Sequence, residues 1–227
     1  AENDRLTIGT STVTKPDGMC IELAMGYVGT LLSTFRTPLA AIESIEEFSN
    51  DDYPYNDDTL QVLYDCLMTE INMSSPIGGF NIGDSMDAYT SGCVTDVKNW
   101  YNLVFKNSEK WDSDILKYFA TDRKYGSGPY PTTHYPVSMR TFMRSDWSDD
   151  ALAMSFTAAG EGSHGHRDQL SLAMVAYGKS LLTDQSYGAI LTGNTRKYMI
   201  APVQHNLVTI NDFTDTPTGT PTSYYKM

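Results

Sequence analysis

The stretch EGSHGHRDQLSLAMVAYGKSLLTDQSYG, residues 161–188, joins a histidine-containing turn to two apolar runs. The runs are rich in β-favouring side chains and are separated by Gly178-Lys179, which predicts a tight hairpin at that dipeptide. His164 and His166 stand two residues apart, so on a regular strand both side chains would lie on one face. Gly165 between them has no side chain, which allows a ligand or another backbone to approach closely.

The remainder of residues 137–227 also carries the period of two that is typical of strands. Further expected strands are VSMRTFMRSD (137–146), DALAMSFTAAG (150–160) and HNLVTIND (205–212). A total of about six strands is small for a β-sandwich of ordinary size. We therefore expect this chain to be one piece of a longer protein.

Residues 1–124 have helical periodicity instead, and residues 125–136 (YGSGPYPTTHYP) are typical of a linker. The expected helices span residues 18–35, 57–73, 91–107 and 109–121. Helices followed by strands predict an α+β protein, or an α-helical domain followed by a β domain.

The composition limits the classes of function. Hydrophobic residues make up 41% and aromatic residues 11% of the chain, as in a globular protein. The 16 Lys and Arg against 28 Asp and Glu give a net charge of −12, which disfavours wrapping a nucleic-acid backbone. A local cluster of Arg and His could still bind an acidic ligand. No apolar run reaches transmembrane length.

The three cysteines, Cys20, Cys66 and Cys93, match no metal-binding spacing and no disulfide framework. One disulfide with one remaining thiol is compatible with this number, although buried thiols are favoured.

The histidines offer a candidate metal site. His164 and His166, with a nearby carboxylate and a third histidine, could bind zinc, and the available partners are Asp168, Asp184 and His205. The alternative is a polar strand end whose histidines are satisfied by hydrogen bonds. A hairpin turn at 178–179 would pair Asp184 with Ala173, away from His166, so Asp184 could reach the histidines only if the strand bends.

Four motifs that occur in order resemble the heparinase II/III-like segment of polysaccharide lyases, a family that includes heparinases and alginate lyases. The motifs, within residues 139–212, are Arg144-x-x-Trp147, His164-Gly165-His166-x-Asp168, Leu181-Leu182-x-Asp184 and His205-Asn206. Weaker similarities are DGMCIELAMGY (17–27), which contains Glu22 and Tyr27, and FNIGDS (80–85). The resemblance implies part of an incomplete α/α toroid followed by an antiparallel β-sandwich.

The resemblance also implies a structural zinc ion held by His166, Asp184 and His205. It implies that His164 faces the substrate cleft, near the uronate carboxylate. Because residues two apart share a face on a regular strand, this division requires a bend or twist at Gly165.

The catalytic roles follow from the resemblance. Tyr27 would act as catalytic acid, or as both base and acid, and Tyr187 would line the cleft as a further catalytic residue. Arg144 and Glu22 would bind substrate. The alternatives are a core aromatic for Tyr27, an ordinary strand-end tyrosine for Tyr187, and a salt bridge of Arg144 to Asp146, Asp149 or Asp150.

The implied reaction is β-elimination on a uronic-acid-containing polysaccharide by a secreted or periplasmic lyase. The family also supplies an Asn-His pair from an earlier toroid helix, but no such pair precedes His134 in this chain. We expect that pair upstream of Ala1. The rival hypotheses are a non-catalytic carbohydrate-binding relative with a zinc-stapled β core, a hydrolase with a catalytic zinc, and a structural module.

Overall fold

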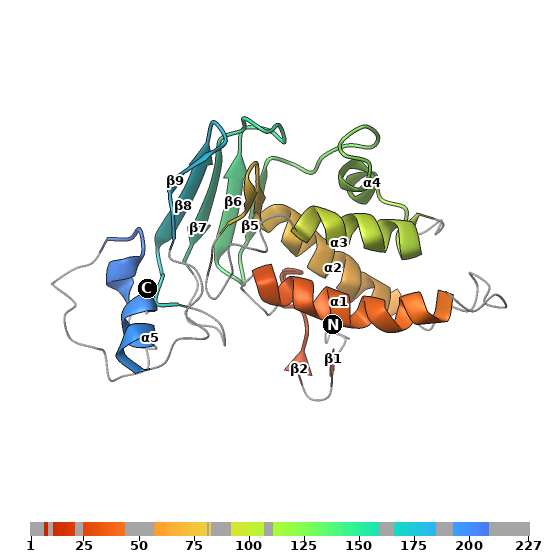
Figure 1. The fold of residues 1–227 in the computed structure, drawn as a ribbon, viewed down its shortest axis with the longest axis horizontal. Helices are drawn as coiled ribbons and strands as arrows, with labels where there is room; N and C mark the ends of the chain where they lie inside the picture. Colours follow the sequence, from red (N-terminus) through yellow and green to blue (C-terminus); the bar gives the residue numbers. More distant parts are fainter. Residues whose placement is uncertain are drawn as a thin grey trace.

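The computed structural model of the chain describes residues 7–8, 11–20, 25–43, 57–80, 82, 92–106, 111–158, 166–184 and 193–208. Its main body is a group of helices packed beside one antiparallel sheet (Figure 1). Two short hairpins accompany them, formed by β1 (Thr7–Ile8) with β2 (Ser11–Thr12) and by β3 (Ser74–Ser75) with β4 (Gly78–Gly79).

The four helices of the N-terminal half are α1 (Met25–Glu43), α2 (Asp57–Met73), α3 (Gly92–Trp100) and α4 (Asp114–Ala120). The helix expected over 57–73 is confirmed at both ends. Its first turn carries acidic side chains, which interact favourably with the positive end of the helix dipole. A π-helical segment, Tyr101–Phe105, continues α3 within the expected range. The expectation of a helix from residue 18 is wrong, because Thr14 pairs with Cys20 in an antiparallel bridge instead.

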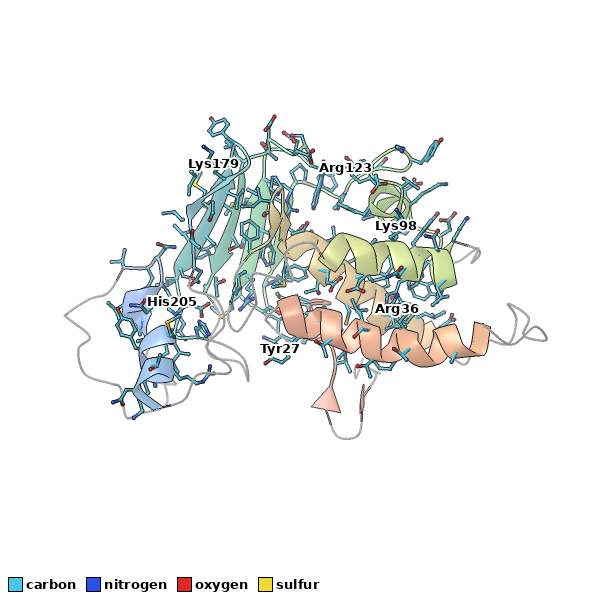
Figure 2. The ribbon with its side chains drawn as sticks, viewed as in Figure 1. Tyr27, Arg36, Lys98, Arg123, Lys179 and His205 are labelled. Atoms are coloured by element: carbon cyan, nitrogen blue, oxygen red, sulfur yellow. The ribbon has the colours of Figure 1, made fainter. Side chains whose placement is uncertain are left out.

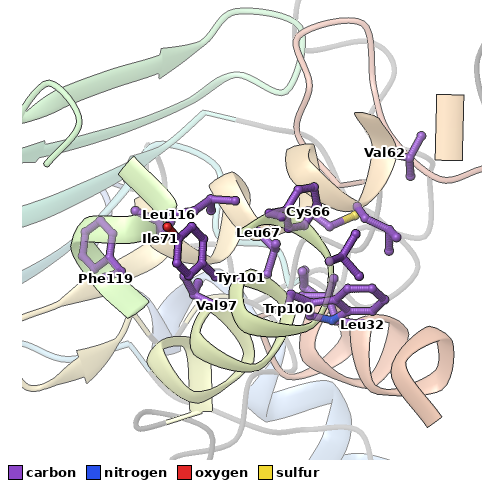
Figure 3. Close-up of a cluster of buried hydrophobic side chains, with 14 of the residues drawn as sticks. Leu32, Val62, Cys66, Leu67, Ile71, Val97, Trp100, Tyr101, Leu116 and Phe119 are labelled. Carbon is purple, nitrogen blue, oxygen red and sulfur yellow. The ribbon is translucent and has the colours of Figure 1, made fainter. Parts of the chain in front are cut away.

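The helices pack around a continuous apolar core (Figure 3). Leu32 of α1, Leu67 of α2 and Trp100 of α3 are fully buried in it. On α2, Leu63, Leu67 and Ile71 recur every four residues, which places them on one face of the helix. Such a stripe is typical of an amphipathic helix that packs one face on a core.

The sheet is a five-stranded antiparallel meander in the order β5-β6-β7-β8-β9 (Figure 1). Its strands are β5 (Thr132–Tyr135), β6 (Arg140–Arg144), β7 (Ala153–Thr157), β8 (Ser171–Ala176) and β9 (Lys179–Leu182). Strand β5 lies inside the segment expected to be a linker, so that expectation is wrong for residues 132–135.

The β8–β9 hairpin turns at Tyr177-Gly178, one residue before the expected Gly178-Lys179. Tyr177 has a φ of 53° and Gly178 a φ of 65°, the left-handed pair that a two-residue hairpin loop requires. A bulge between Met174 and Val175 then shifts the register, so that Leu182 pairs with Met174. Asp184 therefore leaves β9 beside the start of β8, and not opposite Ala173 as expected.

The helices and the sheet share a second core. Met19 and Met73 from the helical half lie in one buried cluster with Phe142, Ala153 and Val175 from three neighbouring strands. The two halves therefore bury apolar surface against each other, which fixes the sheet beside α2.

The C-terminal part contributes α5 (Gly193–Met199) and a 3₁₀ turn, Pro202–Gln204. Residues 205–208 form bends, so the strand expected over 205–212 is wrong there, and residues 209–212 lie outside the described residues. None of the described helices is both long enough and apolar enough to cross a membrane.

Candidate functional site

A buried polar cluster lies at the end of the sheet where β8 begins and β9 ends. His166 precedes β8, Asp184 follows β9, and His205 follows the 3₁₀ turn. The Nδ1 of His205 pairs with the Oδ1 of Asp184, and both side chains are buried. The imidazole rings of His166 and His205 have centroids 5.2 Å apart, inclined at 49°.

Backbone hydrogen bonds hold the three segments together. The Leu172 N–H donates to the Asn206 carbonyl at 3.0 Å, and the Arg167 N–H donates to the Ile200 carbonyl at 3.0 Å. The Asn206 side-chain amide donates to the Thr183 carbonyl at 2.9 Å. Segment 200–206 therefore crosses the ends of both strands, and this crossing delivers His205 to Asp184.

Two further charged residues, Arg140 and Asp168, are buried in the same region. Burial lowers the pKa of Arg140 to about 10, although the charges of Asp168 and Asp184 oppose that shift. Burial raises the pKa of Asp168, and Arg140 and His205 partly offset this rise. The cluster therefore places opposite charges near one another in a region away from water.

The Nε2 of His205 and the Oδ2 of Asp168 are buried and have no hydrogen-bond partner among the described residues. Buried polar atoms are normally paired, so each of these could serve a ligand. Within the described parts of the chain, however, no group of three or more His, Cys, Asp or Glu side chains has an arrangement that could hold a metal ion.

Tyr27 lies in the first turn of α1 and is half-buried. Figure 2 shows Tyr27 and His205 in the lower part of the molecule, whereas Arg123 and Lys179 lie at its upper edge. Three other residues predicted for the site, His164, Tyr187 and Glu22, lie outside the described residues.

Arg144 lies at the opposite end of β6 from Arg140 and the histidines. It pairs with Ala153, which in turn pairs with Val175 beside the β8–β9 turn. Four residues along a strand correspond to roughly 13 Å. The structure therefore does not bring Arg144 to the histidine cluster.

The contacts of Arg144 are structural. Its Nη2 donates to the carbonyls of Asn72 at 2.7 Å and Ser74 at 3.1 Å, at the end of α2. Its guanidinium lies 3.9 Å from the centre of the Trp147 ring, and burial lowers its pKa to about 10. The alternative of a salt bridge is not formed among residues 111–158, where Asp149 pairs with Arg123 at 2.6 Å.

A cavity of about 660 Å³ adjoins Arg144 at this upper end. Trp147, Phe119 and Ile77 form apolar parts of its wall. Phe119 packs edge-on against Trp147, and the Trp147 Nε1–H donates to the Pro129 carbonyl at 2.8 Å. The tryptophan is therefore occupied by protein contacts on several sides.

Comparison with solved structures identifies the architecture. The heparan sulfate lyase HepC of Pedobacter heparinus matches with a TM-score of 0.69 and 21% identity, over 85% of this chain and 30% of that one. A heparinase III, the BT4657 gene product, matches with a TM-score of 0.72 and 24% identity, over 86% of this chain and 30% of that one. Another heparinase III matches with a TM-score of 0.69 and 16% identity, over 88% and 33%.

The chain has the fold of one part of the heparinase III structures. It spans about a third of the length of those lyases. No protein-family profile matches the sequence, and no curated protein matches it in sequence. The likeness is therefore one of three-dimensional arrangement at low sequence identity.

Within this heparinase III fold, the sequence motifs did not single out Arg140. The signal was present in the strand itself, because Arg140, Phe142 and Arg144 alternate onto one face. That face is the buried one, with Phe142 fully covered. A strand pattern that points two arginines inward indicates buried partners for both.

Proposed function

We propose that this chain is part of a polysaccharide lyase that cleaves a uronic-acid-containing polysaccharide by β-elimination. The observation that carries the proposal is the heparinase III fold with its buried His166–Asp184–His205 cluster at one end of the sheet. The acidic polysaccharide substrate is proposed by analogy with the heparinase and heparan sulfate lyase structures, to which this chain is similar.

β-Elimination sets three chemical requirements. A base must remove the C5 proton of the uronate, donors must stabilise the resulting enolate-like dianion, and an acid must protonate the departing C4 oxygen. We assign proton transfer to Tyr27, which stands in the first turn of α1. We assign carboxylate stabilisation to His164, a catalytic, cleft-lining role to Tyr187 and substrate binding to Glu22.

We further propose that His166, Asp184 and His205 hold one structural zinc ion. Two imidazoles bound to one tetrahedral zinc have ring centroids roughly 5 Å apart. The 5.2 Å between His166 and His205 agrees with this spacing, and Asp184 lies next to His205. The Nδ1 of His205 and the Oδ1 of Asp184 are in direct contact, so zinc binding would have to separate these two atoms. When bound, the ion would tie the start of β8 to the segment after β9.

The test is an assay of the chain alone and of the complete gene product that contains it. Each is incubated with heparan sulfate and with alginate, and unsaturated uronate is followed by its ultraviolet absorbance. We expect Tyr27→Phe to lower kcat by at least about 100-fold with little change in KM. Tyr130→Phe, at a tyrosine that is 87% exposed, is the matched control and should retain activity.

The second candidate function is that of a non-catalytic carbohydrate-binding relative. A non-catalytic carbohydrate-binding module would bind the polysaccharide and release no unsaturated product. Binding without product by the complete gene product would therefore replace the lyase proposal with this one.

A further inference from the structure

Two cysteines from distant parts of the sequence meet in the helical core. Cys20 and Cys66 are both fully buried, and both are thiols in the structure. Both belong to one buried core cluster, and the interaction with the Cys20 side chain is the largest cause of the raised pKa of the Cys66 thiol. Figure 3 shows Cys66 among the apolar side chains of α1, α2 and α3.

The backbone around Cys20 is fixed against α2. The Cys20 N–H donates to the Thr69 Oγ1 at 3.1 Å, and that hydroxyl donates to the Asp65 carbonyl at 2.9 Å. Cys20 also closes an antiparallel bridge with Thr14. These contacts hold Cys20 against the turn of α2 that carries Cys66, so the thiol contact does not depend on the two side chains alone.

We propose that Cys20 and Cys66 form a disulfide bond that ties the N-terminal segment to α2. A disulfide has an S–S distance of about 2.05 Å, so the two sulfur atoms would have to move closer together than two thiols in contact. The bond would close the loop of residues 21–65, which contains α1 and Tyr27. It would therefore fix the entry to the helix that carries the assigned catalytic tyrosine.

The chemistry requires a disulfide oxidant, either a small disulfide such as oxidised glutathione or an oxidoreductase. One cysteine thiolate attacks the oxidant and releases one thiol, and the second cysteine then attacks the mixed disulfide and releases another. The two cysteines lose two protons and two electrons, and the oxidant is reduced to two thiols. An exported protein would meet such oxidants.

The bond should form during folding and not afterwards. The interaction with the Cys20 side chain and burial raise the pKa of the Cys66 thiol, so little thiolate exists in the packed state. Once formed, a bond between two fully buried residues is shielded from reductants.

The experiment compares refolding in a glutathione redox buffer with refolding in a reductant. Both samples are denatured, alkylated and weighed by intact mass spectrometry. We expect one alkylated cysteine after oxidative refolding and three after reductive refolding. Cleavage before aspartate separates all three cysteines, so the disulfide-linked peptides should contain Cys20 and Cys66.

Two variants complete the test. Cys93→Ser should still form the bond, and its melting temperature should rise by about 10 °C on oxidation. Cys66→Ser should show no such rise. Three alkylated cysteines after oxidative refolding, or a bond that includes Cys93, would overturn the proposal. The mass measurements require no lyase activity, so they are independent of the proposed function.

Discussion

His205 and Asp184, 21 residues apart, form a buried pair through the imidazole Nδ1 and the carboxylate Oδ1. The pair joins the segment after the 3₁₀ turn to the end of β9. It fixes the orientation of the His205 ring, and the buried Nε2 is left without a hydrogen-bond partner in the described part of the chain. This single contact connects stability with the proposed metal site.

Replacement of His205 tests that connection. We expect His205→Ala to reduce bound zinc from about one ion per chain to near zero, measured by elemental analysis after dialysis. The free energy of unfolding should also fall by about 3 kcal/mol, because Asp184 is left buried without its partner.

The matched control is His134→Ala on β5, since His134 is exposed and bonds only to Thr141 among described contacts. It should leave both values unchanged. Equal zinc contents in the His205 and His134 variants would rule out His205 as a ligand.

Arg144 is predicted to stabilise the fold and not to bind substrate. Arg144→Lys keeps the charge but loses the planar group that bonds the Asn72 and Ser74 carbonyls and stacks on Trp147. We expect a loss of about 2 kcal/mol in urea unfolding with unchanged KM. Arg123→Lys, at an exposed ion pair, should cost less than about 1 kcal/mol. A raised KM with wild-type stability would instead support a substrate-binding role for Arg144.

Glu70 makes stability depend on pH. Burial, followed by the charge of Asp96, raises the pKa of Glu70 well above its ordinary value. The folded chain therefore holds a proton that the unfolded chain releases, and this contribution to stability is lost as pH rises from about 4 through the folded pKa.

We expect Glu70→Gln to raise the free energy of unfolding at pH 8 by at least about 1 kcal/mol and to flatten its pH dependence. Chemical unfolding at several pH values measures both quantities. The exposed Asp150→Asn is the control and should shift neither. A variant curve parallel to wild type would exclude titration of Glu70.

Asp17 has the opposite pH dependence. Burial raises its pKa, but hydrogen bonds from Ser138 and Met19 outweigh burial and lower the pKa overall. The Ser138 N–H and Oγ–H donate to the two carboxylate oxygens at 2.7 and 3.0 Å. This stabilisation is present above the unfolded pKa, near about 4, and is lost as pH falls through the folded pKa.

Asp17→Asn should therefore lower stability at pH 7 by about 1 kcal/mol and should reduce the loss on acidification. Thermal melting between pH 7 and pH 3 gives the comparison. Ser138→Ala should produce a similar loss at pH 7, since it removes one of the two hydrogen bonds that Ser138 donates. The contact joins the start of the chain to the β5–β6 turn. Full stability in both variants would show that it contributes nothing to the free energy of unfolding.

Local patterns predicted the elements whose contacts are close in sequence. The i, i+4 stripe on α2 and the alternation of β6 each depend on residues a few positions apart. The hairpin turn was misplaced by one residue, because both Tyr177 and Gly178 adopt left-handed φ angles, which a non-glycine residue rarely does. The bulge at Met174 could not be predicted, since nothing in the local alternation marks it.

The sequence by itself determined the helix-then-strand order, the buried faces of α2 and β6, and the order of the histidine and aspartate motifs. Only the tertiary structure decided that Asp184 meets His205, that Arg140 lies near the histidines while Arg144 does not, and that Cys20 contacts Cys66. Spacing and alternation fix which face a side chain occupies. Which distant segments meet on that face depends on strand register and on the crossing of separate segments, and these are set by packing of the whole chain.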